Sequence, residues 1–236
     1  MGSMILGRNS LKWIAAASML CDHIACVFLQ EGNAEQFAAW SFENRLYLFL
    51  RIIGRIAFPI FCFVLVQGFL TTRNIRKYLL RLLVFALLSE IPYDLALSNR
   101  IMDLSQQNVI FTLFIGVVVL YGIQRFSKRP WLQGGVILLG CLMAFYLQVD
   151  YSVFGIGCIV MFYLLAAYPK QWLWLMAVPF VMMGNIEPFA VLALPICSLY
   201  DTEKEERRMP RYFFYLFYPA HLFILWAIFE ICQKIC

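Results

Sequence analysis

Residues 11–29, LKWIAAASMLCDHIACVFL, decide the fold, because they form an apolar run long enough to cross a bilayer as a helix. The chain has only two histidines, and one of them, His23, lies within this run. The other, His221, lies in a second apolar run, residues 212–229. Ionisable groups at membrane depth are costly to bury and usually mark a site or a pathway. Both histidines are therefore candidate functional residues.

The composition indicates a polytopic membrane protein. Hydrophobic residues make up 63% of the chain and charged residues 14%, which leaves too little polar surface to cover a soluble globule. The first apolar run has the length of a span and lacks a small-x-small cleavage site, so we interpret it as a transmembrane helix and expect no cleavable signal peptide.

Apolar runs continue along the whole chain, and short polar segments separate them. A window of about 20 residues finds nine runs, at 11–30, 46–70, 78–97, 109–124, 131–148, 153–168, 171–184, 186–200 and 212–232. No long linker and no clear repeat interrupts them. The sequence predicts one all-α domain over 1–236, a transmembrane bundle of about nine spans, with eight to ten as the range.

Basic residues fall on alternate loops, and this predicts the orientation. Lys and Arg are retained on the cytoplasmic side of short loops. Nine spans with a cytoplasmic N-terminus leave only Arg45, Arg100 and Lys234 on the opposite loops and place the following basic residues on the cytoplasmic side: Arg8, Lys12, Arg73, Arg76, Lys77, Arg81, Arg125, Lys128, Arg129, Lys170, Lys204, Arg207, Arg208 and Arg211. The net charge of +5 is thus a topology signal and gives no reason to invoke nucleic acid.

Seven of the eight cysteines lie within the apolar runs, so we expect free thiols that pack as small apolar residues. No Cys or His pairs show zinc-ligand spacing, and we expect no metal.

Two pairs of buried charges lie in the second and third runs. Arg51 and Arg55 are four residues apart and share a helix face, as do Glu90 and Asp94. Counting depth along antiparallel neighbours pairs Arg51 with Asp94 and Arg55 with Glu90. These pairs are either static clamps or parts of a functional site, and the sequence leaves both interpretations open.

His23 and Asp22 lie at a depth close to that of Glu90 and Arg55. Neighbouring helical residues point about 100° apart, so either Asp22 or Glu90 could orient the His23 imidazole. His221 follows Pro219, which disposes the last helix to kink, and it fits a structural role as well as a catalytic one.

Four further polar residues open or close runs on the opposite, outer side. Gln107 and Asn108 precede the fourth run, and Asp150 and Tyr151 follow the fifth. They could line the same cavity and bind substrate together with Arg51 and Asp94. The alternative is ordinary helix capping and interface anchoring.

The chain resembles the TraX family of membrane proteins, named for a conjugation protein that N-acetylates pilin. The segments that carry the resemblance are LKWIAAASMLCDHIA at 11–25, RIIGRIAFPIFCFVLVQGF at 51–69, YLLRLLVFALLSEIPYDLA at 78–96, QNVIFTLFIG at 107–116, VDYSVFGIG at 149–157 and YPAHLFIL at 218–225. The resemblance implies a membrane acyltransferase of the bacterial cytoplasmic membrane, which transfers acetyl groups from cytoplasmic acetyl-CoA. The wider superfamily typically has Arg ten residues before the first-helix His, whereas here Lys12 stands eleven residues before His23.

That spacing also has a physical meaning. Eleven residues place Lys12 and His23 on nearly one helix face, roughly 16 Å apart along the axis. A charged cofactor could rest its phosphates at the membrane surface while its thioester reaches the imidazole. The candidate phosphate ligands are basic residues, each of which also serves as a topology signal: Lys12, Arg73, Arg76, Lys77, Arg81, Arg207, Arg208 and Arg211.

The resulting hypothesis gives His23 the role of general base on an acceptor amine or hydroxyl, with Asp22 or Glu90 steadying the imidazolium. Arg55 would stabilise the oxyanion, and His221 would be a second acid–base group or a channel wall. Direct transfer and a covalent acetyl-histidine both remain open. The expected partners are membrane lipids, acetyl-CoA and an acceptor, such as a protein N-terminus, a sugar or a small amine.

Two other classes of protein fit the buried charges. One is a secondary transporter or proton-coupled channel, although the chain has no matched halves. The other is a non-catalytic assembly factor whose charges organise the bundle. Only the acyltransferase requires thioester chemistry.

Overall fold

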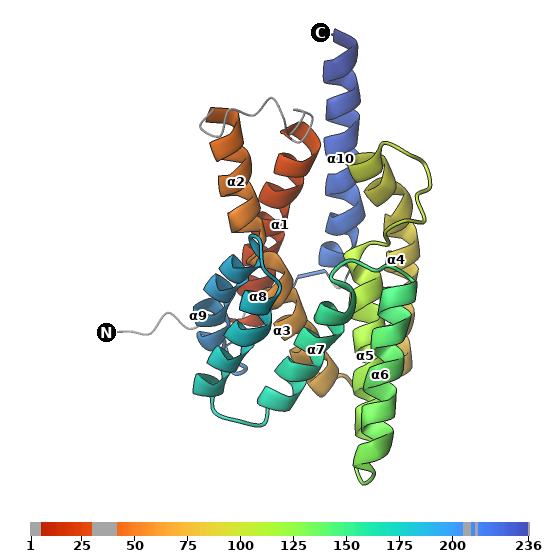
Figure 1. Ribbon diagram of the computed structural model, residues 1–236, viewed down its shortest axis with the longest axis vertical. Coiled ribbons are helices and arrows are strands. Elements are labelled where there is room, and N and C mark those ends of the chain that lie inside the picture. The colour runs from red at the N-terminus through yellow and green to blue at the C-terminus, as the bar shows by residue number, and fades with distance from the viewer. Residues whose placement is uncertain (1–5, 30–41, 205–208, 211, 236) are drawn as a thin grey trace, which may run out of the picture.

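The computed structural model describes residues 6–29, 42–204, 209–210 and 212–235, and over these residues the fold is a helical bundle without strands (Figure 1). The helices are α1 (Arg8–Phe28), α2 (Phe42–Gly54), α3 (Ala57–Thr71), α4 (Ile75–Ser98), α5 (Val109–Arg125), α6 (Pro130–Tyr146), α7 (Ser152–Leu165), η1 (Lys170–Met176), α8 (Ala177–Met182), η2 (Glu187–Leu192), α9 (Ala193–Ser198) and α10 (Phe213–Ile235). The predicted all-α class is confirmed.

Three stretches of the described chain are long and apolar enough to cross a membrane: Arg8–Phe28, Phe42–Thr71 and Phe213–Ile235. The second of these joins α2 and α3, which meet at a short turn at Arg55 and Ile56. The predicted run 46–70 is therefore one long span with a break beside its buried arginine. The remaining apolar helices are mostly shorter than a span, and the count of nine is not confirmed.

The expected runs 171–184 and 186–200 are both helical, but they are short. In each, a 3-10 helix leads directly into a six-residue α-helix, η1 into α8 and η2 into α9, and both stretches are among the helices too short to be candidate spans. Pro179, Pro188 and Pro195 lie in the first turns of α8, η2 and α9, where a missing backbone N–H is tolerated. Gly184, with φ of 73°, supplies the left-handed conformation for the sharp turn between the two short pairs.

The predicted grouping of the basic loops is visible at one end of the molecule. The turns that follow α3, α5 and α7 all face the lower end in Figure 1. Two contacts tie the start of the chain to the same end: Arg8 donates to the Thr71 hydroxyl at 3.2 Å, and Leu6 pairs through its backbone with Tyr200, whose carbonyl accepts from Lys170. We call this the basic end.

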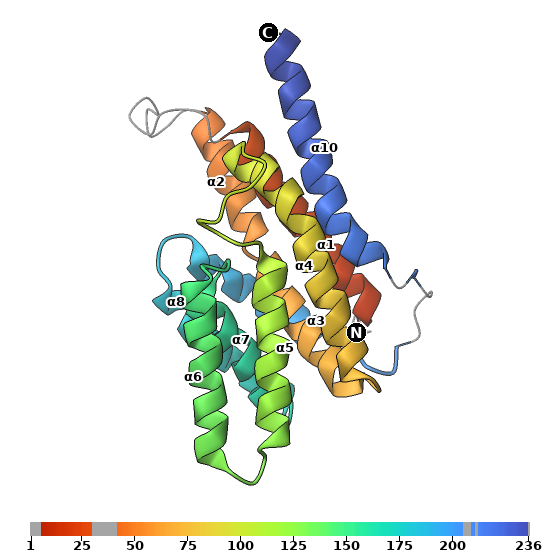
Figure 2. The same ribbon diagram turned by 90° about the vertical axis from the view of Figure 1, so that its right-hand side faces the viewer.

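Helix α10 packs on α1 and α4 with its first half, and its second half extends beyond the other helices (Figure 2). Its buried residues are Tyr218, His221, Leu222 and Leu225, which all belong to the packed half and its border. The same helix exposes Phe223, Ile224, Ile228 and Ile231, and such apolar exposure fits a lipid environment. The packed half of α10 thus brings His221 to α1.

Candidate functional site

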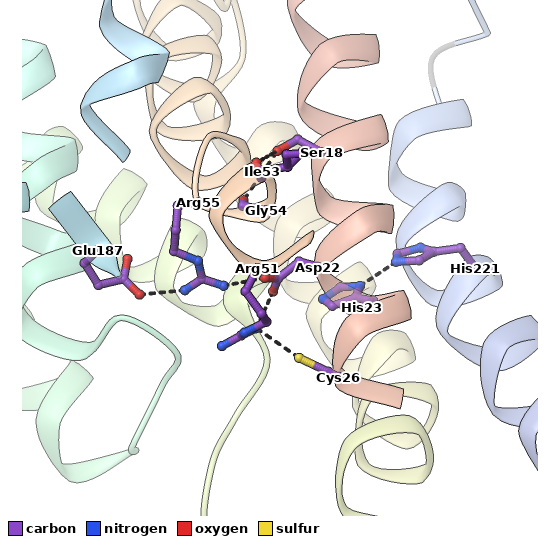
Figure 3. Close-up of polar contacts among 10 residues, drawn as sticks. All are labelled: Ser18, Asp22, His23, Cys26, Arg51, Ile53, Gly54, Arg55, Glu187 and His221. Atoms are coloured by element: carbon purple, nitrogen blue, oxygen red, sulfur yellow. Dashed lines mark hydrogen bonds and ion pairs between the residues drawn. The ribbon is translucent and has the colours of Figure 1, made fainter. Parts of the chain in front are cut away.

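The two histidines meet in the interior, although 198 residues separate them along the chain. His23 Nδ1 lies 2.7 Å from His221 Nε2, and the two rings are nearly parallel, with planes 11° apart and centroids 4.9 Å apart. Helix α1 supplies one ring and α10 the other (Figure 3). Both side chains are buried, with exposed fractions of 9% for His23 and 6% for His221.

The hydrogen bonds of this pair determine which nitrogen is free to act as a base. His221 Nδ1 lies 2.7 Å from the Phe217 carbonyl oxygen, which can only accept, so Nδ1 carries the hydrogen. Nε2 of a neutral His221 then has a lone pair and accepts from His23 Nδ1. This leaves the lone pair of His23 on Nε2. The arrangement orients His23 with an imidazole, where the sequence had suggested a carboxylate.

Asp22 points to the other side of α1 and binds two arginines. Its Oδ2 accepts from Arg51 Nη1 at 2.8 Å, and its Oδ1 accepts from Arg55 Nη2 at 2.7 Å. Arg55 also donates from Nη1 to Glu187 Oε1 at 2.6 Å (Figure 3). The network joins α1 to the α2–α3 turn and to η2. Buried charges of this kind are stable only when they are paired, and here each of the four takes part in an ion pair.

Helices α1 and α2 approach closely at this network because Gly54 has no side chain. A Cβ at Gly54 would overlap the Asp22 side chain. The hydroxyl of Ser18, one turn earlier on α1, donates to the Ile53 carbonyl on the opposing helix. These contacts fix the rotation of α1 and so direct His23, the next residue after Asp22, towards α10.

The predicted pairs Arg51–Asp94 and Arg55–Glu90 are wrong, and so is the assignment of Asp22 or Glu90 as the partner that steadies His23. Counting depth fixes the height of a residue but not the direction in which it points, and α2 packs mainly on α1. Both arginines therefore form ion pairs with Asp22. His23 forms its hydrogen bond with His221 on α10.

Glu90 and Asp94 have other partners at the outer end of α4. Asn108, which is fully buried, donates its side-chain amide to Glu90 Oε2 and to the Ala86 carbonyl, the latter at 2.9 Å. Asp94 Oδ2 accepts from the Asp103 backbone amide at 2.8 Å. Each carboxylate keeps one buried oxygen without a partner in the described structure, Glu90 Oε1 and Asp94 Oδ1.

The remaining outer residues have structural contacts. Asn108 caps α5 by accepting from the Ile110 amide at 3.0 Å, as the capping alternative predicted. Gln107 pairs through its backbone with the 148–150 turn, and the Asp150 amide donates to its carbonyl at 2.9 Å. Tyr151 stacks on Phe58, with ring centroids 3.7 Å apart. A shared role in substrate binding stays a prediction.

A cavity of about 780 Å³ opens at the basic end between α1, α3, α4, α5 and α10. Its mouth, at the basic end, is lined by Arg8, Lys12, Arg73, Lys77 and Arg81. Its deeper walls are apolar and aromatic, and they include Met19, Phe61, Leu65, Leu113 and Tyr218. The cavity thus runs from a cluster of cations into the bundle.

The deep end of this cavity adjoins the histidine pair. Arg8, Lys12 and Met19 follow one face of α1 at helical spacing, and His23 comes four residues after Met19 on the same face. Tyr218 lies edge-on to both imidazoles, 6.1 Å from His23 and 5.8 Å from His221 between ring centroids. The predicted alignment of Lys12 with His23 is therefore realised along the cavity.

The structure brings together half of the predicted phosphate ligands. Lys12, Arg73, Lys77 and Arg81 line the cavity, whereas the lining does not include Arg76. Arg207, Arg208 and Arg211 lie outside the described residues. The Lys12 ammonium lies over the Phe214 ring, 5.2 Å from its centroid, in a cation–π contact between α1 and α10.

The sequence does not predict the part that three residues take in this site. Arg8 was assigned to topology alone, although it continues the Lys12 face by one turn. Glu187 is the second residue of the expected run 186–200, where it fits the acidic residues of the outer loops, and the thiol of Cys26 approaches Arg51 Nη1 at 2.9 Å. The seven described cysteines are free, as expected.

The family model described as TraX protein matches residues 7–229. The chain belongs to the TraX family. A curated relative, the probable fimbrial assembly protein FimC of serogroup H1 from Dichelobacter nodosus, is 30% identical over 241 aligned positions, covering 91% of this chain and 92% of the relative. No solved structure matches. The family match spans the His pair, the arginine network and the described cavity.

Proposed function

We propose that this TraX family member is a membrane-embedded acetyltransferase that takes its acetyl group from acetyl-CoA. One observation carries the proposal: a cavity leads from a cluster of cations towards a buried pair of histidines, which lie one layer of side chains beyond its deep end. Phosphate groups require such cations, and acyl transfer to an amine or hydroxyl requires a base at the far end.

The cavity suits this donor in size and in polarity. Its volume, about 780 Å³, lies within the range of small-molecule sites. Arg8, Lys12, Arg73, Lys77 and Arg81 would hold the phosphates of the nucleotide, and the apolar walls would take the narrow pantetheine arm. When bound, acetyl-CoA supplies an acetyl group activated as a thioester. The basic end would face the cytoplasm, where the positive-inside rule places such residues.

The histidine pair supplies the base. His23 Nε2, which carries the lone pair, would take the proton from the acceptor amine or hydroxyl as this group attacks the thioester carbonyl. It would return that proton to the thiolate of CoA, which is released when the C–S bond breaks. His23 Nδ1 would keep donating to His221 Nε2, so that the positive charge gained by His23 is shared with a second imidazole. Arg55, predicted as an oxyanion ligand, forms ion pairs with Asp22 and Glu187. We therefore propose that it positions α1 and does not contact the substrate.

The acceptor is proposed by analogy. The printed name of the Dichelobacter relative concerns fimbrial assembly. A protein N-terminus on a fimbrial or pilin subunit is therefore the acceptor class that we propose, in the cytoplasmic membrane of a bacterium.

A non-catalytic assembly factor is the second candidate, because the name of the relative describes assembly and no chemistry. It differs from the first candidate in one requirement. An assembly factor does not need a thioester, whereas the acetyltransferase does.

The test is transfer of radiolabelled acetyl groups from acetyl-CoA by the detergent-purified protein to a panel of peptide N-termini, amines and alcohols. We expect transfer by the wild type and a loss of about 10²-fold or more in His23→Ala, because a positioned base contributes on that scale. His23→Ala should still be stabilised by acetyl-CoA, which shows that the cavity is intact. Full transfer by His23→Ala would overturn the assignment of His23 as the base. No transfer by the wild type with any acceptor would favour the assembly factor.

A further inference from the structure

The cavity stops one layer of side chains short of the histidines. Among the described residues that line it, Met19 and Tyr218 lie nearest to the pair along α1 and α10, and neither histidine is part of the lining. A thioester that reaches His23 must therefore come to rest against these two side chains. They differ in how easily they can move.

Tyr218 is fixed from several sides. Its side chain is buried, with 5% exposed, and its ring stands edge-on to both imidazoles, at 65° to His23 and 67° to His221. The side chain also belongs to the buried hydrophobic core of the bundle. Met19 is an unbranched side chain that adapts its shape readily. Tyr218 is thus the rigid part of the wall.

We propose that Tyr218 determines the length of the acyl group, so that the site accepts acetyl and excludes longer chains. The inference rests on the proposed function and concerns the same site. An acyl chain extends from the thioester carbonyl away from the pantetheine arm, which here means towards the Tyr218 ring and the imidazoles behind it. An anchored aromatic ring leaves no room for added methylenes, and a rigid wall penalises each of them.

The experiment compares acetyl-, propionyl- and butyryl-CoA on the full-length protein in detergent, with thermal stabilisation and single-turnover transfer as the two readouts. Tyr218→Ala should raise the transfer rate with butyryl-CoA relative to that with acetyl-CoA by roughly tenfold, the smaller end of the discrimination that a pocket achieves per methylene. Butyryl-CoA should also stabilise this variant more than it stabilises the wild type. Tyr218→Phe keeps the ring and should keep the preference for acetyl.

Tyr215→Ala is the matched control. Tyr215 lines the same cavity from the same helix, one turn nearer the basic end. Its loss should weaken the binding of all three donors alike and leave their order unchanged. If Tyr218→Ala does not fold, Tyr218→Leu removes the far end of the ring while keeping an apolar side chain, and its expected shift has the same direction.

The outcomes separate the two proposals. A wild type that is stabilised by acetyl-CoA and transfers acetyl, but whose donor preference is unchanged by Tyr218→Ala or Tyr218→Leu, overturns the role of Tyr218 and leaves the acetyltransferase standing. An equal change in Tyr215→Ala overturns it as well. A wild type that binds none of the three thioesters overturns the acetyltransferase itself, and the role of Tyr218 with it.

Discussion

His221 takes the place beside His23 that a carboxylate holds in many acid–base pairs. A carboxylate among apolar helices would bring a charge that needs its own partners, whereas a neutral imidazole needs only the Phe217 carbonyl. The cost is a weaker stabilisation of the protonated His23, since a neutral ring attracts a cation less than an anion does. Sharing of the proton between the two rings offsets part of that cost.

This pairing predicts the behaviour of His221→Ala. We expect acetyl transfer to fall by about 10²-fold, the lower range for acid–base catalysis, because His23 loses both its orientation and its proton-sharing partner. Binding of acetyl-CoA should stay as in the wild type, because the cavity lining is untouched. Single-turnover transfer and thermal stabilisation measure the two effects, and an unchanged transfer rate would show that His221 is only a wall.

Asp22→Asn tests the arginine network. Neutralising Asp22 removes one ion pair from the buried Arg55 and one from the partly buried Arg51, and breaking a buried pair costs about 3–5 kcal/mol. Denaturant unfolding in detergent measures the loss. Glu230→Gln is the control, because its contact with Lys234 is an exposed pair at 3.9 Å and should be worth about 0.5 kcal/mol or less. Equal losses in the two variants would contradict the assigned role.

At the scale of helices, the close approach of α1 and α2 depends on Gly54. Gly54→Ala should lower the free energy of unfolding by about 1–3 kcal/mol, as overpacking does, because the new Cβ collides with Asp22. Gly157→Ala is the matched control in α7, where a Cβ meets nothing within 4 Å. That variant should be neutral or stabilising by about 0.5–1 kcal/mol from helix propensity. A neutral Gly54→Ala would mean that the helices can separate freely.

The helices also show how far the sequence can predict this fold. Long apolar runs such as 11–30 and 212–232 specify their helices, because length and hydropathy are local properties. Residues 171–200 are also apolar, and they form two short helices that each begin as a 3-10 helix, with a turn at Gly184 between them; hydropathy alone does not predict the type of helix. The same limit applies to the site. Helical spacing predicted that Lys12 and His23 share a face, but it could not say that α10, and not α4, would face His23.

At the scale of the whole molecule, five helices from distant parts of the chain enclose one cavity, and the two ends of this cavity differ in charge and polarity. The basic end gathers cations near the surface, where water and counter-ions lower the cost of their mutual repulsion. The inner end is apolar and leads to a pair of imidazoles that need no counter-charge. A donor with an anionic head and a narrow neutral arm matches both ends.

The central claim, that this cavity holds acetyl-CoA, is tested most directly by the thermal stability of the purified protein as acetyl-CoA is titrated. We expect stabilisation that rises with donor concentration, as binding to the folded state requires, and a smaller effect with dephospho-CoA. Lys77→Glu, at the cavity, should weaken binding by about tenfold, or about 1.4 kcal/mol, whereas Arg76→Glu, the neighbouring residue outside the lining, should bind as the wild type does. No stabilisation at any concentration, or equal losses in the two variants, would contradict the account.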